Sequence, residues 1–160
     1  MKYLLALSSL LVFSMPAFAD SHAEPKSMEA PSTISTKLSP HSVNDTMDKF
    51  EAIVKSKGFD VFVRIDHQKN AEAAELTMAP AQVIIFGNPK GGTMLMNDDI
   101  RVALDLPLRV VVYQAKDEKV YIAYHKPVDM VKEYDLEGHK VIGALTDGLD
   151  KLTSAAVASE

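Results

Sequence analysis

Apolar side chains follow two different periods along the chain. Met47, Phe50 and Val54 recur at helical spacing, which predicts an amphipathic helix. Between Phe59 and Asp66 every second residue is apolar, which predicts a strand, and Phe62 makes its second face partly apolar. The same reasoning predicts strands at 32–38, 83–86, 108–113 and 120–124, and helices over 67–76, 96–104, the residues after Pro127, and 141–152.

Cap and turn residues agree with these elements. Ser42 to Asp45 can cap the first long helix, and Gly58 stands where a left-handed helix stop is expected. Residues 114–119 join two strands as an antiparallel hairpin. Strands that meet through hairpins, with helices at the start and the end, favour a single α+β domain over a doubly wound α/β domain. The first and last helices should cover one face of its sheet.

The second face of the sheet has several possible roles. Phe62, Tyr113, Tyr121 and His125 are predicted to lie on it. Such a face can be solvated, bind a ligand or pack against another subunit. Homodimerisation through this face or through a sheet edge is therefore one expectation.

Residues 1–19 have the pattern of a cleavable secretory signal. Lys2 precedes an almost wholly apolar run from Leu4 to Phe13, and Ala17-Phe18-Ala19 supplies small residues before a cut. A membrane anchor is the alternative, but the run is shorter than the roughly 20 residues that span a bilayer. We expect cleavage near Ala19-Asp20 and export, most simply to a bacterial periplasm, as a soluble chain. The predicted order is a signal peptide at 1–19, a flexible leader at 20–31, the α+β domain at 32–153 and a frayed tail at 154–160.

Charge and composition disfavour several kinds of partner. Removal of residues 1–19 takes away only Lys2, so the formal net charge changes from −5 to −6. A mildly acidic chain with scattered basic residues is a poor candidate for binding nucleic acid, which requires clustered Lys and Arg. The sequence contains no cysteine, so neither a disulfide nor a lipid-modified cysteine is available. No cofactor is required by any pattern in the chain.

Two histidines are candidates for chemistry. His67 follows Asp66 at the end of a predicted strand, where it could act as a general base or simply end a turn. If the strands carrying His67 and His125 are neighbours, Met94 and Met96 could complete a copper site with them. Methionines near a helix start are more often core residues, which is the simpler interpretation of that pair.

The segment Gly87-Asn88-Pro89-Lys90-Gly91-Gly92-Thr93 joins a predicted strand to a predicted helix. Backbone N–H groups in such a position can hold an anion, and Lys90 would add charge. Pro89 removes one donor, and the spacing matches neither a P-loop nor a dinucleotide fingerprint. We therefore favour a tight connector whose glycines adopt positive φ and whose Asn88 side chain closes the turn. The sequence offers no nucleophile constellation, which favours a non-enzymatic protein.

Several motifs occur together in one order along residues 39–135. They are Gly58-Phe59-Asp60-Val61-Phe62, Asp66-His67 with Ala71 and Ala74, Ala79-Pro80, Phe86-Gly87-Asn88-Pro89, Gly92-Thr93, Leu106-Pro107-Leu108, and Tyr124 with Pro127. In this combination the chain resembles the bacterial family known as domain of unknown function 302, DUF302. The resemblance implies a curved antiparallel sheet with helices on one face, as in the TATA-binding-protein-like class, and implies no established activity. Members often have Tyr-Asn-Asp-Pro where this chain has Tyr124-His125-Lys126-Pro127.

The leading hypothesis is an exported, non-enzymatic domain that binds a small molecule or a protein partner. The fold class suggests that an apolar molecule could sit between the sheet and the last helix. A hydrolase-like enzyme that uses His67 with Asp66 or Asn88 is the alternative, and metal binding by the two histidines and two methionines is a second one. The candidate ligand-binding residues are His67, Asn88, Lys90, Gly92, Tyr113, Tyr124 and His125.

Overall fold

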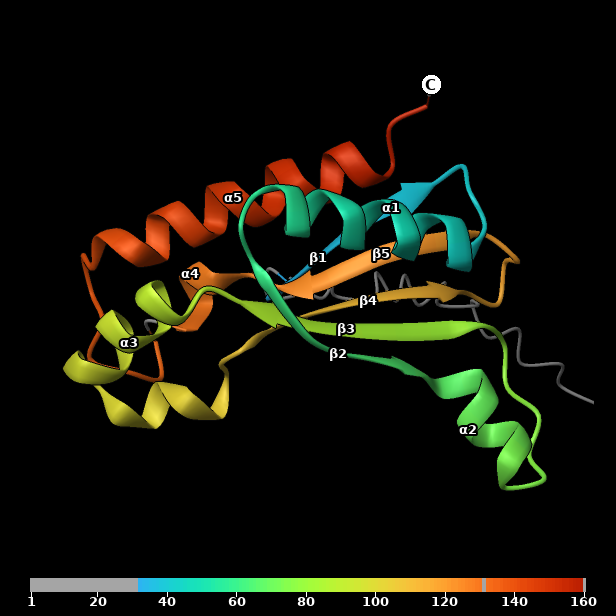
Figure 1. Cartoon of the computed structure of the whole chain (residues 1–160), viewed down its shortest axis with the longest axis horizontal. Helices are drawn as coiled ribbons and strands as arrows, with labels where there is room; N and C mark the ends of the chain where they lie inside the picture. Colours follow the sequence, from blue (N-terminus) through green and yellow to red (C-terminus); the bar gives the residue numbers. More distant parts are fainter. Residues whose placement is uncertain (1–31, 131, 160) are drawn as a thin grey trace, which may run out of the picture. The chain divides into compact units, whose positions relative to one another are not determined.

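The computed structural model describes residues 32–130 and 132–159. Its centre is one five-stranded antiparallel sheet in the order β1-β5-β4-β3-β2 (Figure 1). The predicted signal peptide and leader lie outside the described residues. The strands are β1 (Ile34–Ser39), β2 (Asp60–Asp66), β3 (Ala81–Gly87), β4 (Leu108–Gln114) and β5 (Val120–His125).

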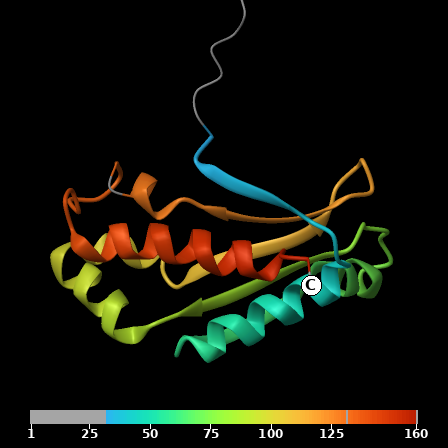
Figure 2. The ribbon, with the colours of Figure 1, turned by 90° about the horizontal axis from the view of Figure 1, so that it is seen from above.

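Two long helices cover one face of this sheet, as predicted. Helices α1 (Val43–Ser56) and α5 (Lys140–Ala156) lie side by side above the strands in both Figure 1 and Figure 2. The Ser42 side chain caps α1 by accepting a hydrogen bond from the Asp45 amide at 3.1 Å, and Gly58 has the left-handed φ of 77° expected after the helix. The fold is therefore the predicted α+β arrangement.

The remaining helices are short and lie beyond the strand ends. They are α2 (His67–Ala73), α3 (Pro89–Asp98), the 3-10 helix η1 (Ile100–Leu104) and α4 (Pro127–Met130). Within the described ranges, no helix is both long enough and apolar enough to cross a bilayer.

Two parts of the helix prediction were wrong. The segment predicted as a connector with positive-φ glycines is largely helical, since α3 already begins at Pro89 and includes Gly91 and Gly92. The helix predicted over 96–104 is divided at Asp99, whose side chain caps η1. At the C-terminus α5 continues past Thr153 to Ala156, which is fully buried.

The alternation predicted in β2 ends at a bulge. The register with β3 shifts between Val61 and Val63, so Phe62 is an extra residue on this strand. Val61 packs against the helix-covered core, but Val63 pairs with Ile85 and is 42% exposed. Beyond the bulge it is Arg64 that faces α1, where it bonds to Asp48 and Glu51.

The interior consists of two apolar clusters. The larger one lies between the sheet and the two long helices, with Phe86 in edge contact with Phe50 and Phe59 at ring-centroid distances of 5.4 and 5.7 Å. The smaller one lies beneath α3 and the start of α5, around Leu95 and Ile142. Leu106 and Leu145 pack against both clusters.

Candidate functional site

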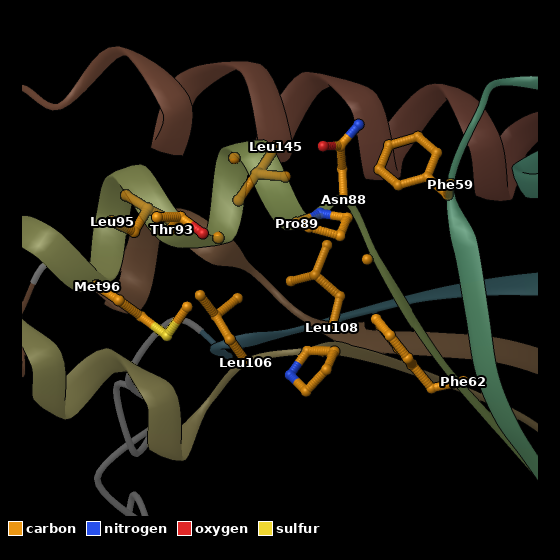
Figure 3. A pocket seen from close by; sticks show the side chains of 14 residues that line it. Phe59, Phe62, Asn88, Pro89, Thr93, Leu95, Met96, Leu106, Leu108 and Leu145 are labelled. Atoms are coloured by element: carbon orange, nitrogen blue, oxygen red, sulfur yellow. The ribbon is translucent and has the colours of Figure 1, made fainter.

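An apolar pocket lies between the two clusters. It has a volume of about 250 Å³ and opens among β2, α3, the segment before β4, and α5 (Figure 3). We call it the seam pocket. Its fourteen lining residues are Phe59, Phe62, Gly87, Asn88, Pro89, Gly91, Gly92, Thr93, Leu95, Met96, Leu106, Pro107, Leu108 and Leu145.

Ten of these fourteen residues belong to four of the sequence motifs. Phe59 and Phe62 come from the first motif, Gly87-Asn88-Pro89 from the second, Gly92-Thr93 from the third, and Leu106-Pro107-Leu108 from the fourth. The motifs are up to about fifty residues apart in the chain, and the antiparallel pairing of β2, β3 and β4 brings their ends together. The four motifs therefore meet around this pocket, and Leu106 and Leu108 also pack in the larger cluster.

Asn88 fixes how the chain enters α3. Its side-chain oxygen accepts a hydrogen bond from the Lys90 amide at 3.0 Å, and Pro89 occupies the first turn of the helix, where a missing N–H costs nothing. The prediction that Asn88 closes this turn with its own side chain is confirmed. The cap positions the start of α3 beside the end of β3, and Gly91, Gly92 and Thr93 of this helix line the pocket.

Gly91 and Gly92 lie inside α3, and neither has a positive φ. A Cβ atom added at Gly92 would approach nothing closer than Leu106 Cδ1 and Met96 Cε, both at 3.9 Å. At Gly91 the nearest atom would be Val141 Cγ1 at 3.8 Å. These are ordinary van der Waals distances, yet glycine inside a helix costs about 0.5–1 kcal/mol relative to alanine. Neither backbone conformation nor crowding requires glycine at these two positions.

Gly87 is different, because it lies between two rings that line the pocket. An added Cβ would meet Phe62 Cε2 and Pro107 Cβ, each at 3.5 Å. The bulge in β2 places Phe62 beside Gly87, where its ring is 55% exposed. The irregular residue of β2 thus supplies one wall of the pocket.

The chemistry of the seam pocket is simple. Among the described residues its lining includes no charged side chain, and Asn88 and Thr93 supply its only polar side-chain groups. An apolar surface with one or two polar groups can hold and orient a small uncharged molecule. The lining contains no general acid, general base or nucleophile pair.

The structure divides the predicted site residues among several places. Asn88 and Gly92 line the seam pocket, but Lys90 is exposed in the first turn of α3 and is not part of the lining. Tyr113 stacks on Tyr121 on the face away from the helices, at a centroid distance of 5.8 Å. Tyr124, in contrast, is buried in the larger cluster.

His67 and His125 are far apart, so the condition for a shared metal site is not met. β3 and β4 lie between the strands that carry them, which separates them by at least about 14 Å. The two histidines are also at different heights along the sheet. Across β3 and β4, the residue of β5 that is level with Asp66 is Ile122, which is three residues before His125. In the part of the chain that the structure describes, no group of three His, Cys, Asp or Glu side chains could hold a metal ion.

The partners suggested for His67 have other roles. Asp66 caps α2 by accepting from the Lys69 amide at 3.1 Å, and it also accepts from Gln82 at 3.4 Å. Gln82 is buried and accepts from Arg64 Nε at 2.8 Å. Asn88 is at the opposite end of the sheet. Asp66 thus belongs to a polar network that continues through Gln82 and Arg64 to Asp48 and Glu51 of α1.

The displaced pKa values belong to structural contacts outside the pocket. The Arg101 guanidinium, which bonds to both Asp99 carboxylate oxygens, holds the pKa of Asp99 far below its usual range. The hydrogen bond that Tyr134 donates to Asp105 raises the pKa of this tyrosine. None of these groups lines the seam pocket, so electrostatics gives no indication of catalysis there.

Sequence reasoning missed most of the lining, including Phe59, Phe62, Leu106, Pro107 and Leu145. Phe62 was predicted only for the second sheet face, and the other four were not among the predicted ligand-binding residues. The family motifs could have pointed to the pocket, because most of the unpredicted lining residues belong to them. Only the strand register shows that these motifs converge.

Comparisons with known proteins agree with this architecture. The profile of the family described as "Domain of unknown function DUF302" matches residues 34–155. The crystal structure of an uncharacterized conserved DUF302 protein from Bacillus stearothermophilus superimposes with a TM-score of 0.63 at 21% identity, covering 78% of this chain and 95% of that one. This likeness shows a shared fold.

Curated relatives come from Brucella. The chain is 36% identical over 123 residues to "Fluoride-specific ion channel FluC 1" of Brucella suis biovar 1 (strain 1330), and equally to the protein of that name from Brucella abortus biovar 1 (strain 9-941). These matches cover 76% of this chain but only 48% and 46% of the relatives. The chain therefore spans about half the length of the curated relatives it matches.

Proposed function

The chain belongs to the DUF302 family, and on that premise we propose that it is a non-enzymatic domain that binds a small uncharged apolar molecule in the seam pocket. The observation that carries the proposal is the convergence of four separate motifs on one apolar cavity.

The glycines of α3 support the same proposal. Two neighbouring glycines weaken a helix, and here neither a positive φ nor a close contact accounts for them. Their effect is to leave space beside Leu106 and Met96. Binding of a ligand in this space would explain why glycine occupies these positions.

Size and polarity define the class of ligand. At about 250 Å³ the pocket is just below the roughly 300–1,000 Å³ typical of drug-sized ligands, so it suits a molecule on the order of ten non-hydrogen atoms. Phe59, Phe62 and the two prolines form flat apolar walls, while Asn88 and Thr93 can orient one polar group. We propose a compact neutral molecule with an aromatic or branched apolar body.

Indole is a suitable probe, because the chain contains no tryptophan and any emission from an indole ring comes from the ligand alone. We expect saturable indole binding that Gly92→Leu abolishes by filling the pocket. Gly143→Leu is the matched control, since Gly143 is likewise the fourth residue of its helix and has nothing within 4 Å of an added Cβ. Absence of saturable binding, or equal loss in both variants, would contradict the proposal.

We also propose that the domain acts after export. The pattern of residues 1–19 supports this, and N-terminal sequencing of the protein recovered from the host envelope tests it. A mature chain that begins at Asp20 is the expected result. An unprocessed Met1 would contradict export by cleavage.

A second candidate function follows from the Brucella relatives. This chain matches about half of the length of each of two proteins named as fluoride channels. We therefore propose that the domain assists a membrane channel as an accessory partner. Fluoride itself does not suit the seam pocket, since a small hydrated anion needs several polar donors. Deletion of the gene should increase the fluoride sensitivity of growth, and unchanged sensitivity would argue against this candidate.

A further inference from the structure

Among the described elements, no helix covers the central strands on the sheet face away from α1 and α5 (Figure 1). We call it the open face. On β3, Val83 and Ile85 lie on either side of Ile84, which points into the helix-covered core. On β4, Val111 lies in the same way between the core residues Val110 and Val112. Alternation therefore places Val83, Ile85 and Val111 on the open face.

This pattern is unusual for a solvated sheet. Antiparallel sheets with one face in water alternate apolar residues on the inside with polar residues on the outside. Here apolar residues occupy both sides of the central strands. Leu38 and Val63, near the two edges of the sheet, are 55% and 42% exposed on the same face.

The open face also has few charges. Its strand positions include Asp60 and Arg109, whose charges are opposite and cancel. The chain as a whole, in contrast, has a net charge of −5. Two copies can therefore approach through this face without the repulsion expected between other surfaces of an acidic protein. An apolar centre with a polar rim is the usual composition of a homodimer interface.

The available area is sufficient for a modest interface. Five strands at about 4.8 Å spacing and six or seven residues long give a face of roughly 24 by 20 Å, or about 500 Å² on each copy. Two such faces bury about 1,000 Å², close to the lower limit for a specific dimer.

We infer that two copies of this chain pack through their open faces as a weak two-fold dimer. The middle strand of the sheet is β4, so a two-fold axis near Val111 sets the apolar centre of one copy against the same centre of the other. In chemistry, a second copy of this apolar face matches it better than the sequence that precedes the domain. Residues 20–31 are polar apart from alanines, prolines and the single large apolar side chain of Met28.

Sedimentation equilibrium of protein expressed from the whole sequence tests the dimer. Wild type should pass from monomer to dimer with a micromolar Kd, as a small interface implies. Val111→Lys should weaken dimerisation by at least about tenfold, because it buries an unpaired charge at the two-fold axis. Ala52→Lys adds the same charge to an exposed position of α1, on the other side of the molecule, and should leave Kd unchanged.

A second variant keeps the test decisive if Val111→Lys unfolds. Leu38→Lys changes a side chain that is already 55% exposed, and circular dichroism verifies that the fold is retained. Wild type that remains monomeric at several hundred micromolar would overturn the inference. So would a dimer that both open-face lysines leave intact. Neither result depends on indole binding, so the dimer and the seam pocket can fail separately.

Discussion

Gly92→Ala should make the protein more stable and at the same time a weaker binder. The new Cβ meets no atom closer than 3.9 Å, so the folded state accepts it without strain. Replacing glycine inside a helix stabilises by about 0.5–1 kcal/mol. For a domain of this size that free energy corresponds to a rise in Tm of roughly 2–4 °C.

The same methyl group narrows the seam pocket. It takes up about as much space as a water molecule, or ~30 Å³, of a cavity of about 250 Å³. Overfilling a packed apolar site costs about 1–3 kcal/mol. Indole affinity should therefore fall by about tenfold, since 1.4 kcal/mol corresponds to a factor of ten.

Differential scanning calorimetry and an indole fluorescence titration on one preparation measure both effects. Gly143→Ala is the matched control, because it removes an exposed glycine at the same position of α5 and should raise Tm without changing affinity. A lower Tm for Gly92→Ala would show that the fold requires this glycine. A higher Tm with unchanged affinity would refute the assignment of the ligand to the seam pocket.

Three further predictions concern the fold and the rejected metal site. Asp99→Asn should lower Tm near neutral pH, because Arg101 depresses the pKa of Asp99 in the folded state. In thermal melts at a series of pH values, the Tm difference between wild type and variant should shrink as pH falls below 3.8, the ordinary pKa of an aspartate. A Tm difference that does not change with pH would contradict this cause. Gly58→Ala should destabilise by about 1 kcal/mol in urea unfolding, since φ at this position is 77°, and an unchanged midpoint would show that the turn tolerates a side chain. The strand order keeps His67 and His125 apart, so the double variant His67→Ala, His125→Ala should have the same copper content as wild type in elemental analysis. A loss of bound copper in the double variant would support the metal hypothesis.

The elements that local rules control were predicted well. The apolar spacing of Met47, Phe50 and Val54, with Ser42 before it and Gly58 after it, specified α1 almost to the residue. The β4–β5 hairpin followed from strand patterns on both sides of a polar turn. In these segments propensity, capping and burial all favour the same structure.

The predictions of secondary structure were wrong where two local rules favour different structures, or where residues far away in the sequence determine the local structure. A period of two continues through Val61, Phe62 and Val63 in the sequence, and only pairing with β3 reveals the bulge that reverses the two faces. Two glycines suggested a loop, but the Asn88 cap and Pro89 start a helix through them. Asp99 divides the next helix because its carboxylate accepts from the Arg101 amide.

The candidate site could be predicted only as a set of motifs. Asn88 and Gly92 were identified among the possible ligand-binding residues, and both line the seam pocket. The aromatic wall was missed, because the register of β2, β3 and β4 is what sets Phe62 and Pro107 on either side of Gly87. Strand register depends on the whole sheet, so local sequence patterns cannot supply it.

The most direct test of the seam pocket compares two methionines of one helix by NMR. With ¹³C-labelled methionine ε-methyl groups, Met96 reports on the pocket that it lines, while Met94, which is 55% exposed and outside the lining, is an internal control. On titration with indole the Met96 methyl signal should shift saturably, and the Met94 signal should stay in place. An unmoved Met96 signal, or equal shifts of both methyl groups, would contradict binding in the seam pocket.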